Sequence, residues 1–91
     1  MVKLIGNDIL RSGEKIGWVE GNRIRAHDGK LLGYFEDRYV YSEDNRKLAY
    51  MEGNRLCSGN TNISLEKVNE AIEGGLLPEV GKCAIYVLLG G

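Results

Sequence analysis

The stretch Ile16–Arg25, "IGWVEGNRIR", decides the fold because close copies of it recur along the chain. Sixteen residues later the sequence reads "LGYFEDRYVY" (Leu32–Tyr41), and sixteen residues after that it reads "LAYMEGNRLC" (Leu48–Cys57). A period of 16 is too short for a helical hairpin repeat and suits two short strands with two tight turns. Each copy is therefore predicted to fold as a β-hairpin.

Turn residues recur at matching places in the copies. Glycine, asparagine and aspartate tolerate the positive φ that tight hairpin turns require, so these pairs mark the corners. Residues from about 15 to 57 are thus predicted to form an antiparallel β-meander. The predicted turns are Gly21–Asn22, Asp28–Gly29, Asp37–Arg38, Asp44–Asn45 and Gly53–Asn54.

The turn positions fix the register, and the register fixes which side chains share a face. If Gly21–Asn22 form the corners, Glu20 faces Arg23 and Val19 faces Ile24. One face is then apolar in every copy and is the predicted core, with Val19, Ile24, Ala26, Leu31, Phe35, Val40, Ala49, Met51 and Leu56. The opposite face carries one aromatic residue per copy, with arginines and a further tyrosine nearby: Trp18, Tyr34, Tyr50, Arg23, Arg25 and Tyr41.

A small residue precedes the aromatic residue in each copy. Gly17, Gly33 and Ala49 occupy this position, which indicates close approach of another backbone or a sharp bend. We therefore expect the hairpins to converge on a crowded centre. The copies span 16–31, 32–47 and 48–60, and a partial copy spans about 5–15. The partial copy is one residue shorter between its turns, which predicts a bulge or a different turn type there.

The last third of the chain has a different pattern. Ser64 is a suitable N-cap, Gly74–Gly75 a suitable stop, and a helix is predicted over about 64–74. Pro78 is expected to prevent its resumption. Residues 83–89, "CAIYVLL", are apolar at every position, which predicts a final strand over about 82–89, buried on both faces. The whole chain, 1–91, is predicted to be one mainly β domain, α+β by element count.

The three "G-aromatic…GNR" copies and the tail resemble the four-fold β-flower domains of small bacterial proteins. The resemblance covers most of the chain and implies glycine-turn hairpins, a helix and a terminal apolar strand. This sequence departs from the pattern at Asp37–Arg38, which replace Gly–Asn, and at Ala49, which replaces glycine. The resemblance carries over no activity and no site residues.

Composition narrows the classes of function. Charged residues make up 27% of the chain, the net charge is −1, and no basic stripe is present, so nucleic acid is not an expected partner. No run approaches the roughly 20 apolar residues that span a membrane. The N-terminus lacks the apolar core of a secretory signal, so a cytoplasmic protein is expected, with a leader removed earlier as the alternative. Cys57 and Cys83 are expected to be reduced thiols in the core, with a disulfide as the alternative.

No catalytic, metal or cofactor site is predicted. The single histidine, His27, falls on a turn, and the carboxylates cluster beside turns or on the outer helix face. The aromatic column and its arginines are the predicted binding residues: Trp18, Tyr34, Tyr50, Arg23 and Arg25. The predicted function is a non-enzymatic binding module for a protein partner or small ligand, compatible with a homo-oligomer. The alternatives are a column that packs as second-layer core, and a small enzyme or enzyme-associated subunit whose site is assembled between protomers.

Overall fold

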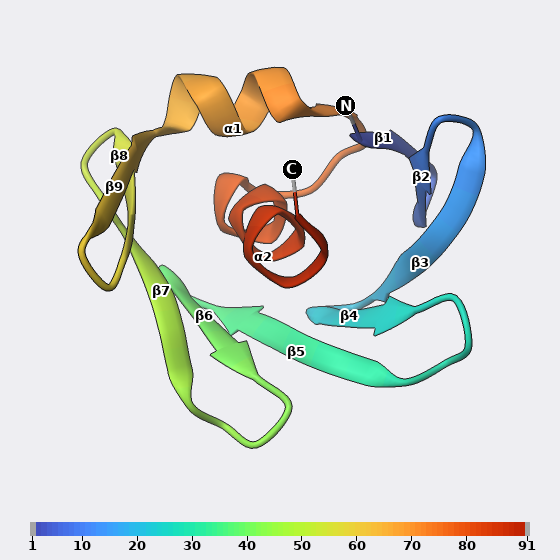
Figure 1. Cartoon of the computed structure of the whole chain (residues 1–91), viewed down its shortest axis with the longest axis horizontal. Coiled ribbons are helices and arrows are strands. Elements are labelled where there is room, and N and C mark those ends of the chain that lie inside the picture. Colours follow the sequence, from blue (N-terminus) through green and yellow to red (C-terminus); the bar gives the residue numbers. More distant parts are fainter. Residues whose placement is uncertain (1, 91) are drawn as a thin grey trace.

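The repeats fold into consecutive hairpins of one large sheet. The computed structural model describes residues 2–90, and these form a ten-stranded sheet with two helices, confirming the mainly β fold class. The sheet follows the order β10-β1-β2-β3-β4-β5-β6-β7-β8-β9 and curls around α2, while α1 crosses between its two ends (Figure 1). The strands are β1 (Val2–Ile5), β2 (Asp8–Arg11), β3 (Glu14–Glu20), β4 (Arg23–Ala26), β5 (Leu31–Glu36), β6 (Tyr39–Ser42), β7 (Lys47–Glu52), β8 (Arg55–Ser58), β9 (Thr61–Ser64) and β10 (Ile72–Gly74), and the helices are α1 (Leu65–Ala71) and α2 (Glu79–Leu89).

The two-residue turns lie where the sequence predicts them, and the register is confirmed. Glu20 pairs with Arg23, and Val19 pairs with Ile24. In three of these turns the first corner residue has positive φ and the second does not, as in a type II′ turn. Gly21 has φ +62° and Gly53 has φ +60°, whereas Asp37 holds φ +56° despite its side chain.

The second turn of the first and second full copies is a three-residue loop, whereas in the third copy Gly59 and Asn60 form a two-residue turn between the paired Ser58 and Thr61. The amide of Ala26 donates to the carbonyl of Lys30 at 2.9 Å, and the amide of Gly29 donates to the carbonyl of Ala26 at 2.9 Å. Gly29 takes positive φ, as the last loop residue of such hairpins does. In the partial N-terminal copy the matching turn contains only Ser12 and Gly13, both at positive φ. The different turn type predicted for that shorter copy is confirmed.

The column of small residues marks close backbone approach, as the sequence predicts. A Cβ built on Gly17 would lie 2.2 Å from the carbonyl oxygen of Arg25, and one built on Gly33 would lie 2.2 Å from that of Tyr41. At Arg25 and again at Tyr41 the register shifts in a β-bulge, and bulges bend the sheet. The third copy has no shift between β8 and β9, and there Ala49 is accommodated.

The helix predicted over 64–74 is shorter than expected. Ser64 is its N-cap, and its hydroxyl accepts from the amide of Lys67. The helix ends at Ala71, because the next three residues form β10 and pair in parallel with β1. Ile72 is fully buried opposite Val2, so tertiary pairing overrides the local helical pattern.

The predicted final strand over 82–89 is wrong, since these residues belong to α2. A short run that is apolar at every position fits a buried helix as well as a buried strand. The surrounding sheet makes the helical solution stable, because it covers α2 along most of its circumference (Figure 1). Pro78 lies at the N-cap and precedes the new helix instead of preventing one. The guanidinium of Arg11 donates to the carbonyls of Leu89 and Gly90 at the other end.

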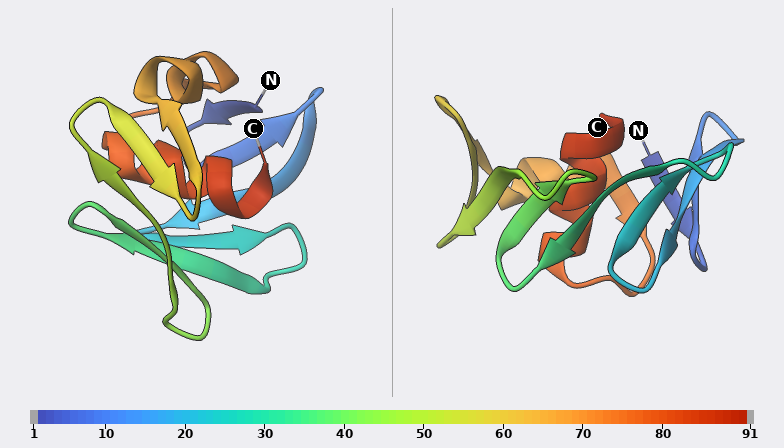
Figure 2. Two further views of the ribbon diagram at one scale, coloured as in Figure 1. Left: turned by 60° about the vertical axis from the view of Figure 1, so that its left-hand side comes forward. Right: turned by 90° about the horizontal axis from the view of Figure 1, so that it is seen from below.

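The core lies between the inner face of the sheet and α2. The predicted core face is wrong at Leu31, because the bulge between β4 and β5 pairs Leu31 with Arg25 on the outer face, and Leu32 packs against the core instead. Val19, Ile24, Val40 and Leu56 are each at most 4% exposed, as predicted. They join Cys83, Ala84 and Ile85 of α2, which are fully buried. Two further views show the hairpins splayed around the helix and α1 crossing above it (Figure 2). The crowded centre expected from the repeats is therefore occupied by a helix.

Candidate functional site

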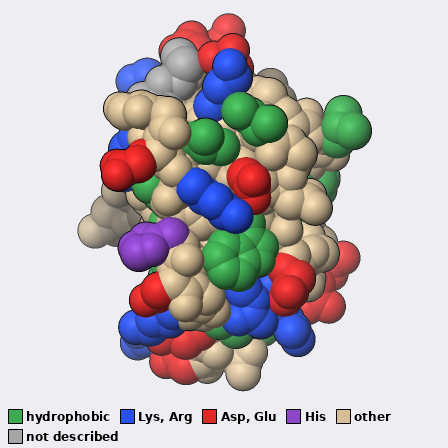
Figure 3. All heavy atoms as spheres, turned by 90° about the vertical axis from the view of Figure 1, so that its right-hand side faces the viewer, with side chains coloured by type: hydrophobic (Ala, Val, Ile, Leu, Met, Phe, Trp, Pro, Cys, Tyr) green, Lys and Arg blue, Asp and Glu red, His purple; other side chains and the backbone are tan. Residues whose placement is uncertain are grey.

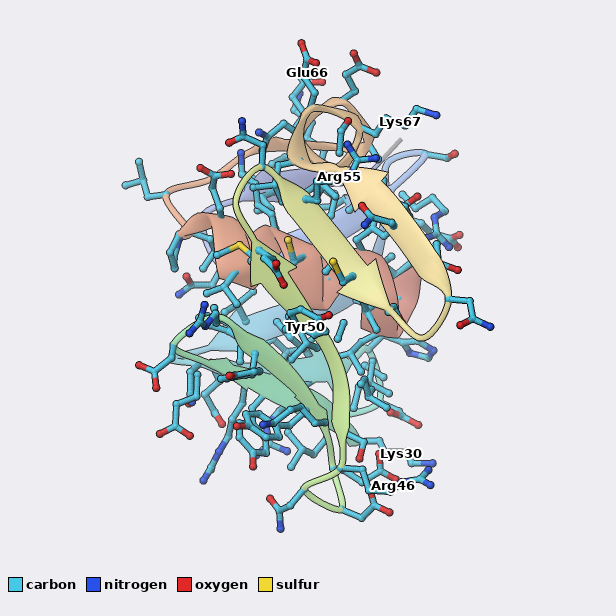
Figure 4. The ribbon with its side chains drawn as sticks, turned by 90° about the vertical axis from the view of Figure 1, so that its left-hand side faces the viewer. Lys30, Arg46, Tyr50, Arg55, Glu66 and Lys67 are labelled. Carbon is cyan, nitrogen blue, oxygen red and sulfur yellow. The ribbon has the colours of Figure 1, made fainter. Side chains whose placement is uncertain are left out.

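The predicted aromatic column lies on the outer face of the sheet, the face turned away from α2. Trp18 and Tyr34 are half-buried, and Tyr50 is 39% exposed. Figure 4 shows Tyr50 on β7, between β8 and the hairpins below it. The column is therefore not covered by either helix. The other form of the second-layer alternative, packing against neighbouring hairpins, agrees with the half-buried state of Trp18 and Tyr34.

The column is not one continuous aromatic row. Strand β4 separates Trp18 from Tyr34, with Arg25 paired opposite Trp18 and Arg23 paired opposite Tyr34. Trp18 has its own surroundings at a shallow hollow of the outer face. The ammonium of Lys15 lies 5.1 Å from its ring centroid and 3.0 Å from the carboxylate of Asp8.

The two predicted arginines differ in their freedom. The guanidinium of Arg25 donates to the carboxylate of Glu20 and to the carbonyl of Gly29, each at 3.0 Å, and is held beside the turn. Arg23 is exposed and forms no ion pair with another residue in the range 2–90. The guanidinium of Arg25 is therefore already hydrogen-bonded within its hairpin, whereas the exposed guanidinium of Arg23 can contact a partner.

The strongest clustering is a group of tyrosines on β5, β6 and β7. We call Tyr34, Tyr39, Tyr41 and Tyr50 the tyrosine surface. The rings of Tyr34 and Tyr41 are stacked, with centroids 4.8 Å apart and an interplanar angle of 16°. The rings of Tyr39 and Tyr41 are tilted by 52° at 6.3 Å, and Tyr50 pairs across the strands with Tyr39. Aromatic pairs of these geometries are worth about 0.5–1.5 kcal/mol each beyond their burial, so the cluster is pre-ordered.

Cations and hydroxyl groups complete the tyrosine surface. The ammonium of Lys47 lies 4.0 Å from the ring centroid of Tyr39, and the guanidinium of Arg38 lies 5.8 Å from it. The hydroxyl of Tyr34 donates to the side-chain oxygen of Asn45 at 2.8 Å. The surface therefore offers aromatic area, hydrogen-bonding groups and positive charge together.

Two tyrosines of this surface have raised pKa values. Loss of solvent around the hydroxyl raises the pKa of Tyr41, and the Glu36 carboxylate adds to the effect. The neighbouring Cys57 and then the Glu52 carboxylate raise the pKa of Tyr50. A tyrosine hydroxyl is protonated at neutral pH even at its usual pKa of about 10, so both groups are potential hydrogen-bond donors there, and the raised pKa values extend this state to higher pH.

Sequence reasoning placed Tyr41 near the column but did not single out Tyr39. The signal was present in the alternation of β6, where Tyr39 and Tyr41 flank the fully buried Val40. Side chains two apart in a strand share a face, so both tyrosines had to lie beside the column. Comparison of the same position in successive copies identified Trp18, Tyr34 and Tyr50 but did not identify residues on the neighbouring strand β6.

The remaining sequence candidates lie at scattered positions. His27 is exposed on the loop between β4 and β5. Both cysteines are free: Cys83 is buried as predicted, whereas Cys57 is half-buried on the outer face beside Tyr50, so its predicted place in the core is wrong.

Among residues 2–90 no three His, Cys, Asp or Glu side chains come together in a way that could hold a metal ion. Neither helix in that range has the length and apolar character needed to cross a membrane.

Acidic and basic side chains are interspersed on the side of the molecule that carries β2 and β3, with apolar groups between them (Figure 3). The near-neutral chain thus presents a surface of mixed charge there.

Comparison of the chain with protein-family models, with curated proteins and with solved structures gave no match.

Proposed function

We propose that this chain is a protein-binding module and that the tyrosine surface is its contact face. The observation that carries the proposal is the gathering of four tyrosines, with Arg38 and Lys47 against their rings, on a sheet face that neither helix covers. Tyrosine and arginine are enriched at the centres of protein–protein interfaces.

The shape of this face favours a protein over a small ligand. Because the sheet curls around α2, its outer face is convex (Figure 1), whereas small-molecule sites are concave. The stacked rings of Tyr34 and Tyr41 already cover part of each other, leaving their edges and the Tyr41 hydroxyl for a partner, since the Tyr34 hydroxyl already donates to Asn45. A pre-ordered cluster also loses little side-chain entropy when it binds, which favours affinity.

The enzyme alternative has weaker support. A general base needs a partner within hydrogen-bond reach of its substrate group. His27 lies exposed on a hairpin loop, and Glu20, Glu36 and Glu52 are exposed beside the turns. Cys57 has Tyr50 as its cross-strand neighbour. These positions favour a binding module over an enzyme.

The architecture also bears on the family that we propose. Successive glycine-turn hairpins arranged around a centre support placement among the four-fold β-flower domains. The helical state of residues 79–89 departs from the terminal strand that this resemblance implied. Family membership is therefore proposed on the hairpins alone.

The test compares two double variants. Tyr39→Ser with Tyr50→Ser alters the tyrosine surface, and Ile5→Ser with Leu76→Ser removes exposed apolar groups that lie elsewhere on the molecule. Circular dichroism first establishes that both variants are folded. A partner captured from the native host by the wild-type chain is then purified, and its Kd is measured for all three proteins by calorimetry.

We expect the tyrosine variant to bind the purified partner at least about 100-fold more weakly, because two central aromatic anchors are lost. The Ile5 and Leu76 variant should bind as the wild type does. Equal binding by all three proteins, or a loss confined to the Ile5 and Leu76 variant, would contradict the proposal.

A further inference from the structure

Helix α2 lies off-centre within the sheet. It packs mainly against β5 and β6, while the β8–β9 hairpin stands away from its C-terminal half. Figure 4 shows this hairpin in front of α2, and Figure 1 shows the separation from a second direction. A hollow of about 220 Å³ lies between them, lined by Leu56, Ser58, Thr61, Ile63, Tyr86 and Val87.

The lining is apolar at the buried Leu56 and hydroxylated at the exposed Thr61, which marks its rim. Leu56 is 2% exposed, while Ile63 and Val87 are half-buried and supply apolar surface. Ser58 and the exposed Thr61 add hydroxyl groups. The Ser58 hydroxyl donates to the carbonyl of Leu48 at 3.1 Å, so its oxygen remains able to accept a hydrogen bond.

We propose that this hollow binds a small neutral molecule with one apolar ring and one hydroxyl group. A closed apolar cavity of roughly 150 Å³ is enough to hold benzene; this hollow is open to solvent on one side, and its volume of about 220 Å³ has room for a ring of that size. None of the six lining residues is charged, so an ionised ligand would lose hydration without gaining a counter-charge. A hydroxyl substituent would meet the serine and threonine at the rim.

This site is separate from the tyrosine surface. Leu56 and Ser58 point to the inner side of β8, whereas Cys57 between them shares the outer side with Tyr50. Occupation of the hollow therefore need not change partner binding at the outer face. The two proposals can fail independently, because each has its own variants and probes.

The test titrates the full chain, labelled at its methyl groups, with p-cresol, toluene and benzoate. We expect p-cresol to cause saturable NMR shifts of the Ile63 and Val87 methyl groups while those of Ile9, far from the hollow, stay in place. Toluene should bind more weakly, and benzoate should not bind. At ten times its Kd, p-cresol should raise Tm by about 6–11 °C.

Two variants locate the effect, with one matched control. Val87→Phe should fill the hollow and abolish the p-cresol shifts, while Leu76→Phe, the same enlargement at a fully exposed side chain, should leave them unchanged. If Val87→Phe does not fold, Thr61→Val tests the rim: its p-cresol affinity should fall about 2- to 10-fold, towards that of toluene.

The proposal is overturned if p-cresol gives no saturable shift at Ile63 or Val87 in the wild type. It is equally overturned if folded Val87→Phe binds as the wild type does, or if benzoate binds as tightly as p-cresol. Shifts spread evenly over the surface would show non-specific association and would likewise count against a built site.

Discussion

Replacing Gly33 with alanine should destabilise this protein markedly, although alanine is normally tolerated better than glycine in ordered structure. The added Cβ would lie 2.2 Å from the carbonyl oxygen of Tyr41 and 3.0 and 3.1 Å from the two terminal methyls of Leu88. Real Cβ contacts essentially never fall below 3.0 Å, so the two strands must move apart. The Leu88 methyls can shift with their side chain, whereas the Tyr41 carbonyl belongs to the β-bulge.

The magnitude follows from two contributions. Overpacking in an ordered interior costs about 1–3 kcal/mol, and disturbing a ladder hydrogen bond at the bulge costs a further 0.5–1.5 kcal/mol or so. We therefore expect a loss of about 2–4 kcal/mol in the free energy of unfolding. For a domain of this size that loss lowers Tm by about 8 °C or more.

Urea unfolding followed by the fluorescence of Trp18, the single tryptophan, measures the effect. Ala49→Gly is the matched control, since it removes a Cβ at the equivalent position and should cost only about 0.5–1 kcal/mol. Adding Leu88→Ala to Gly33→Ala should not restore stability, because the backbone contact is the closer one. A Gly33→Ala variant as stable as the wild type would refute the bulge explanation of the small-residue column.

Three further predictions follow from single side chains. Asp37→Gly should raise the free energy of unfolding by about 1 kcal/mol in urea titrations, because Asp37 holds φ +56° where the other copies have glycine. Ellman's reagent should label the half-buried Cys57 in the native protein and Cys83 only on unfolding. Burial raises the pKa of Cys83 to about 11 from 9.0, so as pH rises the thiol ionises first in the unfolded chain, which lowers the free energy of unfolding. The urea midpoint of the wild type should therefore fall more steeply than that of Cys83→Ala as pH rises from 9 to about 11.

The hairpins were predictable because two local rules agreed. The turn residues specified where the chain reverses, and the two-residue side-chain period then fixed the faces. The pairing of Val19 with Ile24 and the burial of both follow directly from Gly21–Asn22. The close approach at Gly33 was also visible in the repeat, since only a small residue recurs there.

The tail was harder because its structure depends on partners distant in sequence. Ile72 leaves the helical pattern to pair with β1, some seventy residues earlier in the chain. Residues 83–89 are apolar at every position, which fits a buried helix as well as a buried strand, so hydropathy could not distinguish the two. The start signals that could have favoured α2 were Pro78 at the N-cap and Glu79 in the first turn.

The candidate site was partly predictable for a similar reason. Tyr34 and Tyr50 were identified from the repeat, and the hairpin register places them on the outer face. Their clustering with Tyr39 and Tyr41 depends on pairing between copies, which includes a bulge between Val40 and Tyr41. A bulge changes which side chains contact one another, and the sequence has no strong local pattern that predicts the bulge between Val40 and Tyr41.

The measurement that tests the central claim most directly is an NMR cross-saturation map of the labelled chain bound to its purified partner. We predict that saturation transfers to the amides around Tyr39, Tyr50 and Arg38 on the outer face, while the amides of α2 remain unaffected. Transfer centred on α2, or on the β1 and β10 end of the sheet with the tyrosine surface unaffected, would contradict the assignment of the outer face as the contact surface.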